Sequence, residues 1–472
     1  MPTDRGRARL LRPVRVLAVA CLVAACQEAR SASSPEDRLA FPGVTGPATR
    51  TVVSAEAPTA WSAYAAGGRT RLAVLLTDTA SAWLGLAHGL KSIGIPFVIT
   101  RDFRTALEHR VVLVYPMISG SVLSGEALAA LGRHARSGGT LIATNVLGGG
   151  LSDLFGFGDV VASRTRAEVR LNPGLPLTAR FDDPRELHLP LGNGPQRGSL
   201  GSYGYTTPVE PPLATYDDGT AAITRRELDS GGAAYAFGVD VGELLLIGQN
   251  NRDEFIARSY VNGYEPTLDV YLRLLAAMYV QGEPDAVTLG TVPQGRDLSV
   301  LVTHDVDYRY SLERAIKYAR AERSMGIPAT YFIQTKYLRD WNDNAFFDRA
   351  AIGNLKSLDS LGMQIASHTV SHSREFNHMP LGSGDEVYPT YQPRVTAETT
   401  VTGASILGEL RVSKFLLEHF TGLPIDAFRP GHLRNPEALP EALEASGYRF
   451  SSSATANNSL THLPFQLEYH HG

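Results

Sequence analysis

The sequence has 472 residues and a mass of 50.9 kDa. Because a domain usually has roughly 150 residues, this length predicts two or three domains and excludes a single small binding module. Hydrophobic residues make up 43% of the chain and charged residues 19%, which predicts folded cores rather than broad disorder. The formal net charge is -4, without the basic excess that nucleic-acid binders show. We therefore expect no nucleic-acid partner.

Residues 1–26 have the pattern of an export signal. Several Arg residues precede an apolar run over residues 16–25, which is far shorter than the ~20 residues of a membrane-spanning helix. The run ends in Leu-Val-Ala-Ala before Cys26, which resembles a bacterial lipobox. The resemblance implies an exported lipoprotein anchored through lipidated Cys26, on the outer membrane where one is present and facing the periplasm or cell surface. An ordinary signal peptide that contains a Cys is the alternative.

The cysteine positions limit the chemistry of the rest of the chain. Cys21 and Cys26 are the only two cysteines. Beyond the export signal the chain can therefore form no disulfide, no Cys-based zinc site and no thiol nucleophile. Any catalytic metal must be bound by His, Asp or Glu.

Residues 27–68 are rich in Ser, Ala, Pro and Thr, which predicts a flexible tether. After it, short apolar runs alternate with amphipathic segments, a pattern that predicts an α/β domain with a parallel sheet over residues 69–280. The expected strands cover residues 72–76, 96–100, 111–115, 140–144, 234–239 and 243–247, and the expected helices cover residues 81–93, 125–137 and 267–279.

This layout resembles a class I glutamine amidotransferase-like domain, which implies a flavodoxin-like sheet. The phrase Tyr-Asp-Asp-Gly-Thr at residues 216–220 adds to the resemblance. Amidotransferases of that class need a nucleophilic Cys, and none occurs in this region. We therefore expect a non-catalytic domain with a structural or sugar-binding role, followed by a turn-rich linker over residues 281–296.

The second half contains most of the histidines, since nine of the 13 lie from His304 onward. A short apolar strand expected at residues 298–303 runs into His-Asp-Val-Asp. In extended chain Asp305 and Asp307 point the same way and repel each other unless a cation or proton lies between them. Two such acids indicate a metal site or an acid/base pair; an Asp that caps the following helix is the alternative.

A second expected strand, at residues 363–366, runs into Ser-His-Thr-Val-Ser-His. His368 and His372 are four residues apart and share a face if the chain turns helical there, although His pairs at this spacing also occur on surface helices. Together with Asp307 they form a set of two imidazoles and one carboxylate with open coordination positions. A hydrolytic zinc ion needs this arrangement to hold water.

A third motif, Phe-Arg-Pro-Gly-His at residues 428–432, completes a resemblance. Residues 297–472 resemble a polysaccharide deacetylase of carbohydrate esterase family four, the NodB-homology family. Gly-Ile-Pro-Ala-Thr-Tyr-Phe at residues 326–332 and Gly-Tyr-Arg-Phe at residues 447–450 also fit this family. The resemblance implies a deformed (β/α) barrel. We find signals for about five strands where such a barrel needs seven or eight, which suggests a C-terminally incomplete sequence.

The resemblance also implies roles for single residues. Asp305 would be the general base, and Arg429 would be its charge partner. Asp307, His368 and His372 would bind a divalent metal, with zinc favoured and cobalt as the alternative. Because Val306 separates the two acids, where the family has them adjacent, an exchange of roles between them stays open.

Two further departures concern the supporting residues. His432 stands where the family has an aromatic residue whose backbone N–H helps to bind the oxyanion. Ser residues at 451–453 replace an acid that supports the arginine, and Glu409 or Arg411 could belong to a rearranged support network. His462, beside two Leu residues, is a candidate general acid, and an ordinary loop histidine is the alternative.

These patterns predict a metal-dependent hydrolase that removes N-acetyl groups from a cell-surface or cell-wall polysaccharide. O-acetyl esters and other C–N bonds are alternative substrates within the same superfamily. A catalytically weak carbohydrate-binding lipoprotein is the second class of function. A glycoside hydrolase is disfavoured, because the acids come with two histidines rather than as an isolated carboxylate pair.

Overall fold

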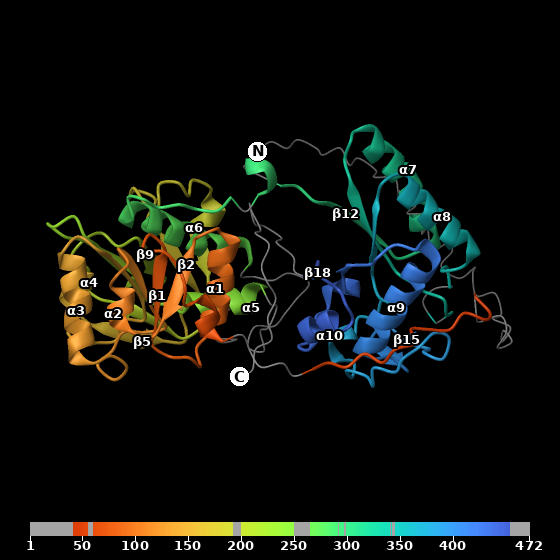
Figure 1. Cartoon of the computed structure of the whole chain (residues 1–472), viewed down its shortest axis with the longest axis horizontal. Helices are drawn as coiled ribbons and strands as arrows, with labels where there is room; N and C mark the ends of the chain where they lie inside the picture. Colours follow the sequence, from red (N-terminus) through yellow and green to blue (C-terminus); the bar gives the residue numbers. More distant parts are fainter. Residues whose placement is uncertain are drawn as a thin grey trace, which may run out of the picture.

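Each half of the chain builds an α/β unit with parallel strands (Figure 1), so the α/β class expected from the sequence is confirmed. No helix in the part described below is both long and apolar enough to cross a membrane. The flavodoxin-like sheet and the deformed barrel, being finer descriptions, stay predictions. The computed structural model describes residues 41–54, 60–191, 200–249, 265–290, 292–296, 299–339, 341 and 345–453.

The first half contains an eleven-stranded sheet in which β2, β1, β3, β4 and β11 run parallel in that order. The sheet continues with antiparallel strands. The strands are β1 Leu72–Leu76, β2 Phe97–Thr100, β3 Val111–Tyr115, β4 Thr140–Thr144, β5 Val160–Ser163, β6 Glu168–Leu171, β7 His188–Pro190, β8 Ser202–Tyr205, β9 Ala214–Tyr216, β10 Ala221–Glu227 and β11 Ala233–Phe237. The helices are α1 Trp83–Ser92, α2 Phe103–Ala106, α3 Gly125–Arg136, α4 Ser152–Phe155, α5 Val241–Gln249 and α6 Glu265–Gly282.

Helices cover the parallel part of this sheet on both faces. Leu72 and Val74 of β1 pack in one core with side chains of α1, α5 and α6, whereas Ala73 and Leu75 pack in another core with side chains of α3 and α4. Because successive side chains of a strand point to opposite faces, a strand that is apolar at every position needs cover on both sides.

One expected strand of this half is wrong. Residues 243–247 lie in helix α5, which begins where Asp240 accepts a hydrogen bond from the Glu243 N–H at 3.0 Å. Leu244 and Leu245 are fully buried in the core. A short, fully apolar run fits a buried helix as well as a buried strand, and its period does not distinguish them.

The second half contains a five-stranded parallel sheet in the order β12-β13-β14-β17-β18. The expected strand at residues 298–303 begins later than predicted, since pairing with β13 starts at Val302 and leaves Leu301 84% exposed. The strands are β12 Val302–Val306, β13 Ala329–Ile333, β14 Gln364–Ser367, β17 Ala427–Phe428 and β18 Phe450–Ser451, with a hairpin of β15 Arg394–Ala397 and β16 Thr400–Thr402. The helices are α7 Arg309–Ser324, α8 Arg349–Ser360, α9 Ile406–Thr421 and α10 Leu439–Ala445.

Residues 41–54 pack against the second half of the chain, although they precede the first half. Phe41 is buried in the core of the second half, and Gly46 forms a bridge with Tyr388. Arg411 of α9 donates a hydrogen bond to the carbonyl oxygen of Thr49 at 2.8 Å. The prediction of a flexible tether is therefore wrong for residues 41–54, because apolar and backbone contacts fix this stretch.

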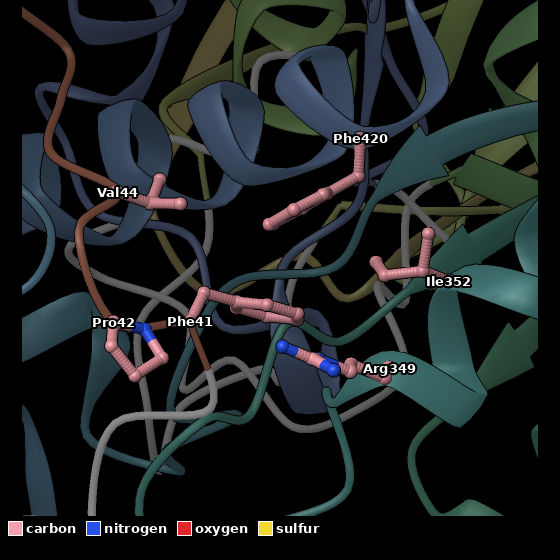
Figure 2. A pocket seen from close by; sticks show the side chains of 6 residues that line it. All are labelled: Phe41, Pro42, Val44, Arg349, Ile352 and Phe420. Atoms are coloured by element: carbon pink, nitrogen blue, oxygen red, sulfur yellow. The ribbon is translucent and has the colours of Figure 1, made fainter.

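The same segment forms one wall of a surface hollow (Figure 2). Phe41, Pro42 and Val44 lie on one side of it, and Arg349 and Ile352 of α8 lie on the other. The ring of Phe420 at the end of α9 completes the lining and packs against Phe41, with ring centroids 4.2 Å apart and the ring planes tilted by 40°.

Candidate active site

The motif residues of the second half meet at the carboxyl edge of its parallel sheet. Asp305 is part of β12 and Asp307 follows it, His368 comes directly after β14, and Arg429 comes directly after β17. Because these strands run parallel in one sheet, their carboxyl ends lie at the same edge. Active sites of β/α proteins form at this edge.

Asp307, His368 and His372 form one compact group of potential metal ligands, with ligand atoms that all lie within 4.8 Å of one another. The Oδ1 atom of Asp307 is 3.3 Å from Nε2 of His368 and 3.5 Å from Nε2 of His372. His368 is 1% exposed, so this group lies mostly below the surface. The structure thus brings together the three residues that the sequence motifs single out as metal ligands.

The hydrogen bonds of His368 define which of its ring atoms faces the group. Nδ1 lies 2.8 Å from the carbonyl oxygen of Arg429. A carbonyl oxygen only accepts, so Nδ1 carries the proton, and Nε2 of a neutral ring presents a lone pair to Asp307. Oδ1 of Asp307 is itself buried without a hydrogen-bond donor. Facing lone pairs at this distance need a cation or proton between them, so the donor set fits a divalent metal.

The pKa shifts of His372 and Asp307 also favour the protonation states that bind a metal. Burial lowers the pKa of His372 to about 3, and the neighbouring His368 adds to this shift. Burial alone would raise the pKa of Asp307, but the interaction with His368 and the nearby imidazoles of His372 and His432 lower it overall. A neutral imidazole and an ionised carboxylate are the forms that bind a metal.

Asp305 stands beside this group and is paired with Arg429. Nη1 of Arg429 donates to Oδ1 of Asp305 at 2.6 Å, while Oδ2 lies 3.9 Å from Nε2 of His368. The guanidinium also stacks over the ring of Phe332, with its central carbon 4.2 Å from the ring centroid. One carboxylate oxygen is therefore held by Arg429, and the other faces the candidate metal ligands.

His432 brings a third imidazole to the site. Its ring centroid lies 4.5 Å from that of His372, and its backbone has a φ of +54°, a conformation that is unfavourable for a residue with a side chain. Burial and the positive charge of Arg374 lower the pKa of His432. The structure places His432 at the site, and its role stays a prediction, as do the roles of the other motif residues. His462 and Cys26 lie outside the described residues.

The network that supports Arg429 differs from the expected one. Its Nε donates to the carbonyl oxygen of Ser452 at 3.2 Å, and its Nη2 donates to Oγ of Ser452 at 2.6 Å and to Oγ1 of Thr303 at 3.0 Å. Glu409 instead binds the loop after His368, and Arg411 binds residues 49 and 51. The expectation that one of them supports Arg429 is therefore wrong.

Sequence reasoning missed Thr303 and Ser452 as partners of Arg429. Ser452 belongs to the Ser run that replaces the family's acid, so its position was visible, but its use of both backbone and side-chain oxygens was not. Thr303 precedes the first motif, and nothing in the spacing marks it. Neighbouring His304, the first residue of the motif that contains Asp305, is bound by Glu322, with Nε2 2.5 Å from Oε1.

A comparison with protein families identifies this region. Residues 294–451 match the family model described as polysaccharide deacetylase, so the C-terminal region carries a polysaccharide deacetylase domain. The first half lies outside this match, and its resemblance to an amidotransferase-like domain stays a prediction. No curated protein matches the chain.

Several solved structures are similar at low identity. The Xyl-CE4 domain of a multidomain xylanase from the hindgut metagenome of Trinervitermes trinervoides is 15% identical over 32% of this chain and 55% of its own, with a TM-score of 0.21. A CE4 family pseudoenzyme from Bacillus anthracis is 14% identical over 32% and 41%, with a TM-score of 0.22. Agd3, described as a novel carbohydrate deacetylase, is 10% identical over 81% and 65%, with a TM-score of 0.35. The chain spans less than two thirds of each of these proteins.

Proposed function

We propose that the deacetylase domain is a metal-dependent hydrolase that removes N-acetyl groups from a cell-surface or cell-wall polysaccharide. The observation that carries this proposal is the buried Oδ1 atom of Asp307, which lacks a donor and faces the Nε2 atoms of His368 and His372. Such a group is unfavourable without a cation. It lies at the edge of the sheet where a substrate can reach Asp305, whose side chain is 41% exposed.

Asp307, His368 and His372 would hold the metal, with zinc favoured and cobalt as the alternative. When bound, the metal supplies a Lewis acid for the acetyl carbonyl and lowers the pKa of a coordinated water toward ~7. The open coordination positions that this chemistry needs follow from the small number of protein ligands.

The chain's own residues then handle the proton. Arg429 holds Oδ1 of Asp305, so Oδ2 is directed to the site and accepts the proton of the attacking water. The backbone N–H of His432 is the proposed donor to the developing oxyanion. A protonated histidine must supply the proton that the leaving amine takes up, and His462 is the candidate.

The compartment belongs to the same proposal. A lipid on Cys26 would hold the protein at a membrane, where a cell-wall or surface polysaccharide is in reach. Mass spectrometry of the detergent-extracted protein would show whether Cys26 is the modified N-terminus.

The direct test combines metal analysis of the purified chain with acetate release from acetylated chitooligosaccharides and from peptidoglycan. We expect one zinc per chain and acetate release that a chelator abolishes and added zinc restores. If the chain binds a divalent metal and an acetylated glycan but releases no acetate, the carbohydrate-binding alternative takes the place of the proposed activity.

A further inference from the structure

A buried carboxylate binds the loop that joins the two candidate metal-binding histidines. Oε2 of Glu409, in α9, accepts hydrogen bonds from the backbone N–H groups of Val370 and Ser371, each at 2.8 Å. Oε1 accepts a hydrogen bond from the hydroxyl of Tyr391 at 2.9 Å. Glu409 is fully buried, with no exposed surface. Both carboxylate oxygens therefore accept hydrogen bonds from groups that surround the side chain.

The loop that Glu409 binds has an unfavourable backbone. Thr369 has a φ of +67° and His372 a φ of +52°, although neither is a glycine. The backbone N–H of His372 donates to Oγ1 of Thr369 at 3.1 Å, which ties the two strained residues together. Such conformations persist only when surrounding groups hold them, so the loop depends on bonds from outside it.

Those outside bonds come from two sides of the loop. From the chain just after β13, the backbone N–H of Thr335 donates to the carbonyl oxygen of Thr369 at 3.0 Å, and Nε2 of Gln334 donates to that of Val370 at 3.1 Å. These donors bind the loop's carbonyl groups. Among the described residues, Glu409 alone has a side chain that accepts from the loop's N–H groups at 370 and 371.

We propose that Glu409 is a positioning residue that fixes the 368–372 loop so that both imidazoles face Asp307. Its hydrogen bonds to the loop go to the backbone between the two candidate metal ligands, and it acts through that backbone. The inference rests on the proposed function, since the geometry that Glu409 holds is that of the candidate metal site.

The test compares Glu409→Gln with a matched control, Glu386→Gln. Glu386 also accepts a backbone N–H, from Ser383 at 2.8 Å, and the hydroxyl of Ser405 at the start of α9, but it does not bind the loop. The Glu409→Gln substitution keeps the size of the side chain, while one acceptor oxygen becomes an NH2 donor. Zinc affinity is measured by competition with a chelator, and hydrogen exchange of the peptide covering residues 368–372 is measured in the metal-free full chain.

We expect Glu409→Gln to weaken zinc binding about 10- to 100-fold, as loss of a group behind the ligands typically does, and to speed exchange in the loop. Glu386→Gln should leave both within about twofold of the wild type. Equal affinity in Glu409→Gln and the wild type, or equal losses in the two variants, would overturn the inference. Should Glu409→Gln not fold, Tyr391→Phe removes the bond to Oε1 together with the hydroxyl's bonds to the backbone of Ser405, which lies outside the loop. An affinity loss of about 2- to 10-fold is expected, and no loss would count against the inference.

A wild-type chain that binds no metal would be a different result. It would remove the proposed function, whereas exchange in the metal-free protein would still decide what Glu409 does. Faster exchange in Glu409→Gln alone would support its hold on the loop, and unchanged exchange would overturn it.

Discussion

The two parallel sheets of this protein differ in what their strands carry. In the first half, β1 and β3 are apolar from end to end and buried at every position, so all of their side chains pack in the core. In the second half, β12 reads Val-Thr-His-Asp-Val and buries only Val306. Polar side chains on a strand weaken its core, and here they extend to the carboxyl edge where a site can form. Apolar runs in the sequence thus indicate where the strands lie, and polar residues at strand ends indicate where the site lies.

The largest expected effect comes from removing one imidazole from each half, which tests whether the metal is bound by the second half. His368→Ala should abolish stoichiometric zinc or cobalt binding and acetate release, because two protein ligands are too few to hold the metal. His188→Ala in β7, an exposed residue paired with Glu168, should leave both unchanged. Metal analysis after gel filtration checks both variants, and full metal content in His368→Ala would remove the candidate site.

The next effect separates the two acids of the second half. Asp307→Asn should lose the metal, because a neutral amide is a poorer ligand than a carboxylate. Asp305→Asn should keep the metal and lose about 10² to 10⁴ in the rate of acetate release, the usual contribution of a positioned general base. Metal content and initial rates of both variants provide the measurement.

The outcomes for these acids decide between the open assignments. Loss of metal in Asp305→Asn alone would mean that the two roles are exchanged. Equal loss in both would make Asp305 a ligand and leave the base unassigned. Glu409 and His304 would be the next candidates for the base, but Glu409 is fully buried and His304 is bound to Glu322.

A core substitution in the first half should lower the stability of the protein and leave its zinc content unchanged. Phe237→Ala in β11 empties the space of a fully buried ring and should lower the free energy of unfolding by about 3–5 kcal/mol. Phe450→Ala in β18, where the ring is 58% exposed, should change it by less than about 0.5 kcal/mol. Denaturant unfolding gives these values, and zinc content of the folded Phe237→Ala protein should equal that of the wild type. A loss of zinc there would show that the two halves are not separable in function.

The sequence predicts some elements of this structure correctly and others wrongly, and the difference lies in how their apolar residues are used. The strands at residues 72–76, 111–115 and 140–144 match β1, β3 and β4 to the residue, because apolar runs bounded by turns leave little choice. Helix α5 looks like a strand in the sequence, because its apolar run is short and buried. The start of β12 is misplaced because the exposed Val300 and Leu301 look like strand residues, and only pairing with β13 sets the boundary.

The site divides in a similar way. Residues within a motif could be placed together, because each motif follows a parallel strand and these strands end at one edge. Residues that act from elsewhere could not: Ser452 reaches Arg429 only because β18 lies beside β17, and Glu409 reaches the loop only because α9 packs behind β14. Such partners depend on tertiary placement, and no spacing along the chain encodes it.

A smaller change in stability is expected where the segment at residues 41–54 contacts the second half of the chain. Arg411→Ala removes hydrogen bonds to Thr49 and Thr51 and should lower the free energy of unfolding by about 1.5–3 kcal/mol, as for bonds to a charged donor. Arg50→Ala, whose exposed guanidinium binds Ser383, should cost less than about 1 kcal/mol. Limited proteolysis checks the location, since only Arg411→Ala should expose this segment to cleavage; equal cleavage in both variants would contradict the assignment.

The last effect, which is nearly absent at neutral pH, is a change in how stability depends on pH. The pKa of His372 is lowered to about 3 in the folded chain, against about 6.5 for a free histidine. Between these values the unfolded chain binds a proton that the folded chain does not, so the metal-free protein loses stability as the pH falls from about 6.5 toward 3. One such proton contributes a slope of at most about 1.4 kcal/mol per pH unit. Denaturant unfolding of metal-free His372→Asn should show a shallower slope than the wild type, whereas His188→Asn, at an exposed site, should not. Parallel slopes in all three proteins would mean that His372 is not held neutral by its surroundings, and the argument from facing lone pairs would lose one of its two imidazoles.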